Sequence, residues 1–186
     1  GQLDEGRCTL ADLWGEAGAV HMALYDHGRA GIGRSEMAIA TLPCPAGRFP
    51  SIARHHPTAP RLERAISDLF GLDPVGAPDD RRWLDHGRWG VRHPLGARTE
   101  ASGQGEDYAF LSAEGEGLHQ IAVGPIHAGI IEPGHFRFTA NGETIVRLEE
   151  RLGYTHKGVE SLLAGAAPDR AALEAGAADN GAPGPR

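Results

Sequence analysis

Short apolar-rich runs near the N-terminus predict three β-strands. Residues 8–14 and 20–25 are separated by the turn-forming sequence Gly-Glu-Ala-Gly at 15–18, a pattern typical of a hairpin. Residues 37–42 form a third such run, which ends before Pro43. The N-terminal part of the chain is therefore expected to contain a small sheet.

A helix is predicted at residues 59–70, because apolar side chains recur there at helical spacing and Gly71 offers a C-terminal stop. Three charged residues lie on its more polar side: Glu63, Arg64 and Asp68. Residues 71–96 are rich in Pro, Gly, Asp and Arg, show no sustained period and are expected to form an ordered, irregular loop. Large apolar residues would hold this loop in place: Trp83, Trp89 and Val91.

Residues 97–117 are expected to be a linker, since Ser, Gly, Gln and Glu are frequent in the first part of this segment. Three further strands are predicted at 118–123, 129–139 and 144–151, and Asn141-Gly142 marks a hairpin turn between the last two. Residues 157–164 could form one or two helical turns. Residues 165–186 contain almost no large hydrophobic residues and are expected to be disordered or only locally helical.

Composition narrows the possible functions. The 186 residues carry a net charge of -7 without a basic cluster, which argues against nucleic acid as a partner. No apolar stretch approaches the roughly 20 residues of a membrane-spanning helix. Ten histidines are scattered without a metal-binding spacing, and the two cysteines, Cys8 and Cys44, cannot supply a four-thiolate site.

The predicted helix and the loop after it carry a family signature. The sequences that form it are Glu-Arg at 63–64, Asp-Leu-Phe-Gly-Leu at 68–72, Pro-Asp-Asp-Arg-Arg-Trp-Leu at 78–84 and Trp-Gly-Val-Arg-His-Pro-Leu at 89–95. Together they resemble the C subunit of NADH-quinone oxidoreductase, the enzyme known as complex I. The resemblance implies that Asp79, Asp80, Arg81 and Arg82 form ion pairs with the large subunit, although a solvated charged loop is the alternative.

A second signature follows the linker. Residues 124–138 resemble the N-terminus of the large subunit of membrane-bound nickel–iron (NiFe) hydrogenases, and residues 151–160 resemble the segment that follows in these enzymes and in the D subunit of complex I. Fusion of the two parts is typical of formate hydrogenlyase and hydrogenase-4. We therefore expect an α+β chain with an N-terminally incomplete domain like the C subunit at 1–96, a linker at 97–117, a β-hairpin region of a large subunit at 118–164 and a disordered tail at 165–186.

Glu132 and His135 are the predicted catalytic residues. Glu132 lies between Ile130-Ile131 and Pro133-Gly134, so partial burial is expected, which would raise its pKa toward the range useful for proton transfer. The resemblance implies a proton gate at this Glu; the alternative is a strand-end Glu bonded to a neighbouring donor. In the D subunit the corresponding stretch forms a hairpin at the quinone, which makes His127 and His135 candidate quinone-binding residues. A structural histidine is the alternative for each.

Four other residues are expected to position groups or to lie at an interface: Arg137, Arg151, His156 and Lys157. The stretch between His127 and His135 is longer than in the quinone family and contains Glu132, which favours a hydrogenase-like site.

The resemblance implies a component of a complex I-like, energy-converting hydrogenase that docks other subunits and supplies a proton-transfer carboxylate. No cofactor is expected on this chain alone; the complex would carry a NiFe centre or use quinone, with iron–sulfur clusters in partner subunits. The chain ends before the cysteine pairs of a hydrogenase large subunit, so it is expected to be a truncated, marginally stable component that is inactive alone. The alternatives are a quinone-reducing NADH dehydrogenase component in which the C and D subunits are joined, and a non-catalytic assembly protein.

The expected partners are the small iron–sulfur subunit of the hydrogenase, which corresponds to the B subunit of complex I, and other hydrophilic-arm subunits, with the membrane arm contacted indirectly. The resemblance also implies a cytoplasmic location, peripheral to the inner face of the cell membrane.

Overall fold

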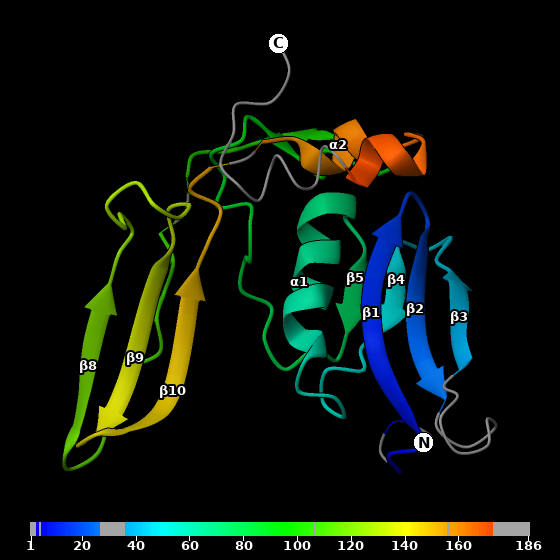
Figure 1. The fold of residues 1–186 in the computed structure, drawn as a ribbon. Coiled ribbons are helices and arrows are strands. Elements are labelled where there is room, and N and C mark those ends of the chain that lie inside the picture. Colours follow the sequence, from blue (N-terminus) through cyan, green and yellow to red (C-terminus); the bar gives the residue numbers. More distant parts are fainter. Residues whose placement is uncertain (1–2, 4, 27–35, 106, 156, 173–186) are drawn as a thin grey trace. The chain divides into compact units, whose positions relative to one another are not determined.

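The computed structural model describes residues 3, 5–26, 36–105, 107–155 and 157–172 (Figure 1). The chain divides into two compact units, Gly1–Asp107 and Tyr108–Arg186. The two units are called unit 1 and unit 2 below. The division lies inside the expected linker, while the family domain limits remain a prediction. Strands and a few helices together confirm the α+β class.

Unit 1 contains an antiparallel sheet with the strand order β1-β2-β3. The strands are β1 (Cys8–Glu16), β2 (Ala19–Asp26) and β3 (Glu36–Pro43). These strands confirm the predicted hairpin and the predicted third strand. The register between β1 and β2 shifts between Leu10 and Asp12, whereas β2 and β3 pair without a shift.

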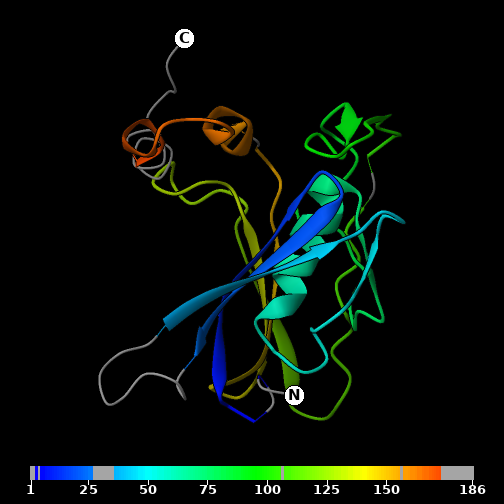
Figure 2. The same cartoon turned by 90° about the vertical axis from the view of Figure 1, so that its right-hand side faces the viewer.

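Helix α1 (Ala59–Phe70) has the predicted bounds and packs against β1 (Figures 1 and 2). It ends at Gly71, whose left-handed backbone (φ 71°) lets its N–H donate to the Ser67 carbonyl. The helix lies close to the sheet at Gly15, where an added Cβ would lie 2.7 Å from Phe70 Cδ2. A cluster of apolar side chains forms the core of this unit: Leu10, Leu13, Val20, Cys44, Phe49, Ala53, Ala59, Ile66 and Leu72.

Four very short strands complete unit 1. Strands β4 (Arg48–Pro50) and β5 (Asp73–Val75) form a parallel pair, and β6 (Val91–Arg92) and β7 (Glu100–Ala101) form an antiparallel pair. The prediction of an irregular loop at 71–96 is therefore wrong at β5 and β6. Strands of two or three residues are too short to produce a recognisable alternation of apolar and polar residues.

Unit 2 is built on an antiparallel sheet with the order β10-β9-β8. The strands are β8 (Leu118–Val123), β9 (His135–Asn141) and β10 (Thr144–Arg151). The predicted strands at 118–123 and 144–151 are confirmed, as is the turn at Asn141-Gly142. The strand predicted at 129–139 is wrong in its first part, because residues 129–134 form a turn and an irregular segment. Gly129 has a positive φ of 72° and Pro133 lacks an N–H, so neither suits a paired strand.

Helix α2 (Val159–Leu163) lies within the helical turns predicted at 157–164. Residues 168–172 are also helical. His156 and most of the tail predicted at 165–186 lie outside the described residues. Within the described ranges, no helix is both long enough and apolar enough to cross a membrane.

Candidate functional site

Helix α1 buries three charged side chains. Glu63, Arg64 and Asp68 are only 1%, 6% and 1% exposed. The side of the helix that the sequence marks as the more polar one therefore faces protein rather than water. Burying a charge is costly unless it is paired and hydrogen-bonded, so each of these groups needs partners.

Glu63 binds the segment that precedes the helix. Its Oε1 accepts the backbone N–H groups of Ile52 at 2.7 Å and Ala53 at 3.2 Å, and its Oε2 accepts the Ser51 hydroxyl at 2.7 Å. The carboxylate thus satisfies backbone donors that no helix or strand would satisfy, and it fixes residues 51–53 against the helix.

Asp68 binds the segment that follows the helix. Its Oδ2 accepts three consecutive backbone N–H groups, from Trp83 (2.8 Å), Leu84 (2.8 Å) and Asp85 (3.2 Å). Its Oδ1 lies 3.2 Å from Arg82 Nη1. One buried carboxylate therefore determines the path of the charged loop that carries the first family signature.

Arg64 holds the same loop through its carbonyl groups. Its guanidinium donates to the backbone oxygens of Arg81 and Arg82, and it pairs with Asp79 at 3.3 Å. Burial alone would raise the pKa of Asp79, but hydrogen bonds from Arg81 and the positive charges of Arg64 and Arg81 outweigh it and lower that pKa. The ion pairs expected between this loop and another subunit are thus formed inside unit 1 by Asp79, Arg81 and Arg82, while Asp80 is exposed.

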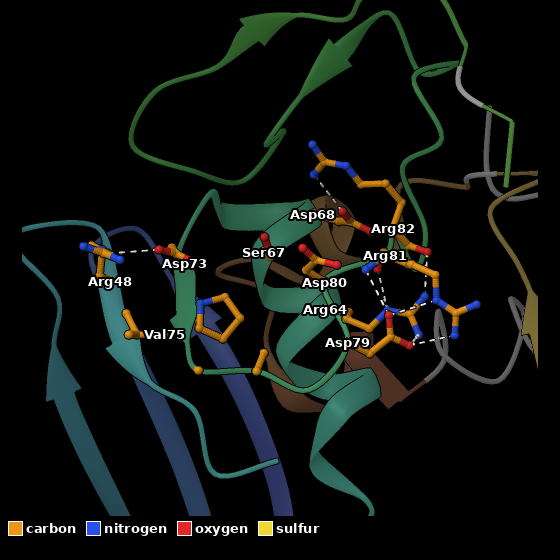
Figure 3. A pocket seen from close by; sticks show the side chains of 13 residues that line it. Arg48, Arg64, Ser67, Asp68, Asp73, Val75, Asp79, Asp80, Arg81 and Arg82 are labelled. Carbon is orange, nitrogen blue, oxygen red and sulfur yellow. Dashed lines mark hydrogen bonds and ion pairs between the residues drawn. The ribbon is translucent and has the colours of Figure 1, made fainter. Parts of the chain in front are cut away.

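A pocket of about 270 Å³ lies between this loop and strand β5 (Figure 3). Its charged lining consists of four arginines and four aspartates: Arg48, Arg64, Arg81, Arg82, Asp68, Asp73, Asp79 and Asp80. Most of these groups pair with one another, as Arg48 does with Asp73 at 2.9 Å. The charges balance, so the net charge of the lining favours neither an anion nor a cation.

In unit 2, residues 124–134 form a loop that closes on itself; we call it the β8–β9 loop. The Gly134 N–H donates to the Pro125 carbonyl at 3.1 Å, and His127 Nε2 donates to the Gly134 carbonyl at 2.8 Å. The two ends approach so closely that a Cβ on Gly124, which has a φ of 85°, would lie 2.2 Å from the Gly134 oxygen. The Gly124–Pro125 peptide is cis. His127 therefore holds the two ends of the loop together.

Apart from His127, the β8–β9 loop exposes most of its larger side chains. Ile126 and Ile130 are 81% and 84% exposed, and the Glu132 side chain is 58% exposed. The expected partial burial of Glu132 is wrong for this chain, because the neighbouring Ile130 and Ile131 are themselves largely exposed and do not cover it. Glu132 forms an ion pair with Lys157, which matches the alternative of a Glu bonded to a neighbouring donor.

His135 lies at the start of β9, partly buried, with its ring centroid 5.0 Å from that of Phe110. Its Nε2 has no hydrogen-bond partner among the described residues. Burial lowers the pKa of His135 and the positive charges of Arg137 and Arg151 lower it further, against the opposing effect of a hydrogen bond to the Gly124 backbone. The imidazole is therefore neutral near pH 7.

The two histidines meet at the same backbone crossing. His127 contacts Gly134, and His135 bonds to Gly124, so both rings lie where the β8–β9 loop begins and ends. Glu132 forms no hydrogen bond with either ring in the described part of the chain. The structure thus brings His127 and His135 together and leaves Glu132 on the outer side of the loop.

Sequence reasoning missed the role of residues 108–112, which were assigned to the linker; we call them the strap. The strap crosses the polar face of the sheet: the Leu111 N–H donates to Glu149 at 3.1 Å, and Arg147 donates to the Leu111 and Ser112 carbonyls at 2.9 Å. The Arg137 guanidinium stacks 4.1 Å from the Phe110 ring centroid. Two aromatic residues in the expected linker, Tyr108 and Phe110, are the sequence feature that could have indicated packing against the sheet.

The side chains of this chain do not fit a nickel–iron centre. Cys8 and Cys44 are buried free thiols of unit 1 and supply no set of thiolate ligands. Over residues 3, 5–26, 36–105, 107–155 and 157–172, no group of three or more His, Cys, Asp or Glu side chains could hold a metal ion.

Comparison with known proteins supports the first sequence signature and also finds hydrogenase relatives. Residues 11–105 match the family described as "Respiratory-chain NADH dehydrogenase, 30 Kd subunit". The chain is similar to hydrogenase-4 component G (40% identity over 122 residues) and formate hydrogenlyase subunit 5 (35% over 123 residues), both from Escherichia coli K12; each match covers 61% of the chain. It is also similar to the C/D subunit of NADH-quinone oxidoreductase from Gluconacetobacter diazotrophicus, at 32% over 146 residues and 65% of the chain. The matches span only 22%, 22% and 24% of these relatives.

Replacing Asp68 by Asn is expected to destabilise unit 1 by about 3 kcal/mol, because a buried amide cannot accept three N–H groups and also balance Arg82. Urea unfolding followed by tryptophan fluorescence measures this loss. Asp73→Asn is the matched control, since the Asp73–Arg48 pair is exposed and contributes at most about 1 kcal/mol. Equal effects of the two substitutions would contradict the structural role assigned to Asp68.

The pKa of His135 is expected to lie below its ordinary value of 6.5 in an NMR titration. Arg137→Gln should raise this pKa by removing a nearby positive charge, whereas Lys157→Gln should leave it unchanged. His135 binds a proton more readily in the unfolded chain than in the folded one. The free energy of unfolding should therefore be unaffected by this group above pH 6.5 and decrease as the pH falls from 6.5 to the folded pKa. An unshifted or raised His135 pKa would refute this account of its environment.

Proposed function

Because the chain belongs to the family of the 30 Kd subunit of respiratory-chain NADH dehydrogenase, we propose that it acts as a component of a complex I-like, energy-converting hydrogenase. Unit 1 docks other subunits, and the β8–β9 loop of unit 2 contributes Glu132 to proton transfer near a redox site. The complex works at the cytoplasmic face of the cell membrane, and the iron–sulfur small subunit is the first partner. Similarity to hydrogenase-4 component G and formate hydrogenlyase subunit 5 supports the hydrogenase type.

One observation carries the proposal: unit 2 has almost no apolar core of its own. Among its described residues only Ala140 is a buried hydrophobic residue, while the other buried side chains belong to Thr139, Glu149 and Arg151. Its isoleucines are largely exposed, including all three of the β8–β9 loop. Exposed apolar surface of this kind is typical of interaction sites, so unit 2 is best explained as one wall of a larger assembly.

The β8–β9 loop suits a site that another polypeptide completes. Its backbone is held by internal hydrogen bonds, so the positions from which its side chains extend are defined before any partner binds. A partner that covered Ile130 and Ile131 would also remove water from Glu132. In such a covered site the Glu132 carboxylate would be able to accept a proton from one neighbouring group and release it to another.

A second candidate function is quinone reduction, in which His135 contacts the quinone headgroup. It is favoured by the buried Nε2 of His135, which has no hydrogen-bond partner among the described residues and could accept or donate one hydrogen bond. The match to the C/D subunit of NADH-quinone oxidoreductase also supports this candidate. Since Phe110 lies against the His135 ring, a headgroup would have to displace that side chain.

A tagged copy of the chain, expressed in its own cells, is expected to co-purify with an iron–sulfur small subunit and other redox subunits, because unit 2 lacks an apolar core. Mass spectrometry of the purified complex identifies the partners. The complex should evolve hydrogen from a reduced electron donor. Recovery of the chain without any redox subunit would refute the proposed function, and a complex that reduces quinone without evolving hydrogen would favour the second candidate.

Glu132→Gln is expected to slow hydrogen evolution by the assembled complex by about 10²-fold or more, since the amide cannot transfer a proton. The amount of assembled complex should not change, because Glu132 makes only an exposed ion pair in this chain. Lys157→Gln breaks the same pair and serves as the matched control, with nearly normal activity expected. Full activity of Glu132→Gln would exclude the proton-transfer role, while a quinone-reducing enzyme should instead lose activity in His135→Gln.

A further inference from the structure

The strap at 108–112 is attached to the sheet of unit 2 by a small number of polar bonds. Glu149 accepts the Leu111 N–H at 3.1 Å, and Arg147 donates to the Leu111 and Ser112 carbonyls at 2.9 Å. Gln120 donates to the same Leu111 carbonyl at 3.1 Å. Leu111 and Ser112 are exposed, so water can replace these bonds and each contributes little net free energy.

Phe110 is the side chain of the strap that lies over the polar face of this sheet. The centre of its ring is 4.1 Å from the Arg137 guanidinium carbon and 5.0 Å from the centre of the His135 ring. His135 and Arg137 are two positions apart in β9, so their side chains extend from the same face. Phe110 therefore covers an imidazole and a guanidinium together.

His135 lies among positive charges while the strap is in place. Arg137 follows it two positions along β9, and Arg151 of β10 is the residue paired with it. Burial lowers the pKa of His135, and the charges of Arg137 and Arg151 lower it further, despite the opposing effect of the Gly124 backbone. A proton on this imidazole would add a positive charge beside two others.

The other ionisable groups on the elements around His135 offer it no counter-ion. They are Tyr108 of the strap, His127 of the β8–β9 loop, and Arg147 and Glu149 of β10. Glu149 is the carboxylate among them; it is 5% exposed, lies 3.2 Å from Arg147 Nε and holds the strap through Leu111. Strand β8 adds no charge, because its residues on this face are Gln120 and Ala122.

The groups beneath the strap also oppose its closed position. Three polar atoms on this face have no hydrogen-bond partner among the described residues: His135 Nε2, Arg137 Nε and Thr139 Oγ1. They belong to alternate residues of β9, and Thr139 is only 2% exposed. A buried polar atom without a partner is unfavourable, and moving the strap away would give these atoms access to water.

We infer that the strap is a cover controlled by a proton: it lies on the sheet while His135 is neutral and moves off when His135 binds a proton. Moving Phe110 away lets water reach both the imidazolium and Arg137, which screens their repulsion. The open form presents His135, Arg137 and Thr139 as one polar surface to a ligand. This inference goes beyond the proposed function and does not depend on it, because the chain itself carries every group involved.

Hydrogen exchange of single backbone amides in the complete 186-residue chain tests the inference. The Leu111 amide reports the closed strap, since it is bonded to Glu149. Its protection factor, which corrects for the intrinsic effect of pH on exchange, should be constant above pH 6.5 and fall by about threefold or more as the pH drops below 6.5.

A second amide shows whether the strap moves separately from unfolding. Phe138 lies in the central strand of the sheet, so its amide exchanges only when unit 2 unfolds. Leu111 should be protected at least about tenfold less than Phe138 at every pH, as expected for a local opening. Equal protection of the two amides would mean that the strap never opens alone, and the inference would be overturned.

His135→Gln cannot take up a proton, so its Leu111 protection should no longer depend on pH. His119→Gln is the matched control, because His119 is exposed on the opposite face of the sheet, and it should behave like the unmodified chain. A pH dependence that survives in His135→Gln would overturn the inference. Should this variant fail to fold, the unmodified chain decides: the NMR titration of the His135 ring and the change in Leu111 protection must share one midpoint, and different midpoints would exclude the coupling.

Discussion

The structure of unit 1 depends on the need to satisfy three charges that helix α1 buries. Glu63 draws residues 51–53 toward the start of the helix, while Asp68 and Arg64 fix the loop at 79–85 beside it. Since Asp68 accepts backbone groups and Arg64 donates to carbonyls, the loop is held by its main chain and not only by its side chains. An irregular segment rich in Pro and Asp can therefore keep one conformation without regular secondary structure.

The same constraint limits what the first family signature can do. The sequence suggests an exposed charged surface at Asp79, Arg81 and Arg82. In the structure, however, their ion-pair partners lie on α1 or in the loop itself. A partner subunit would have to compete with these internal pairs. Exchanging an ion pair that already exists for a new one contributes little to the free energy of binding. Among the described charges of this loop, Asp80 is the more accessible group. The signature is thus explained first by the fold of unit 1.

Elements that follow from local sequence patterns could be predicted. Elements that depend on contacts between residues far apart in the chain could not. The helix at 59–70 and the hairpin turn at Asn141-Gly142 follow from local rules and appear as expected. The pairing of β4 with β5 depends on residues 25 positions apart and leaves no local pattern. The prediction of a strand through 129–134 failed because the adjacent residues Ile130 and Ile131 favour a strand by residue type. The sequence does not reveal that both side chains are exposed. The closed β8–β9 loop brings His127 and His135 close together. Their separation in the sequence does not by itself predict this.

In most sheets with one covered face, the covered face is the apolar one. In unit 2 the polar face is covered and the apolar face is exposed. The strap at 108–112 covers the face that carries Arg137, Arg147 and Glu149: its backbone bonds to Arg147 and Glu149, and the Phe110 ring stacks on Arg137. On the other face, Ile121 and Leu148 are opposite the same residue of β9, Phe138, and are 47% and 46% exposed. Hydrophobic burial stabilises a fold by about 25 cal/mol per Å² of apolar surface, and this unit has buried little of its own. Its polar contacts can define the shape of the sheet, but most of the free energy available from its apolar surface can be gained only when further protein covers it.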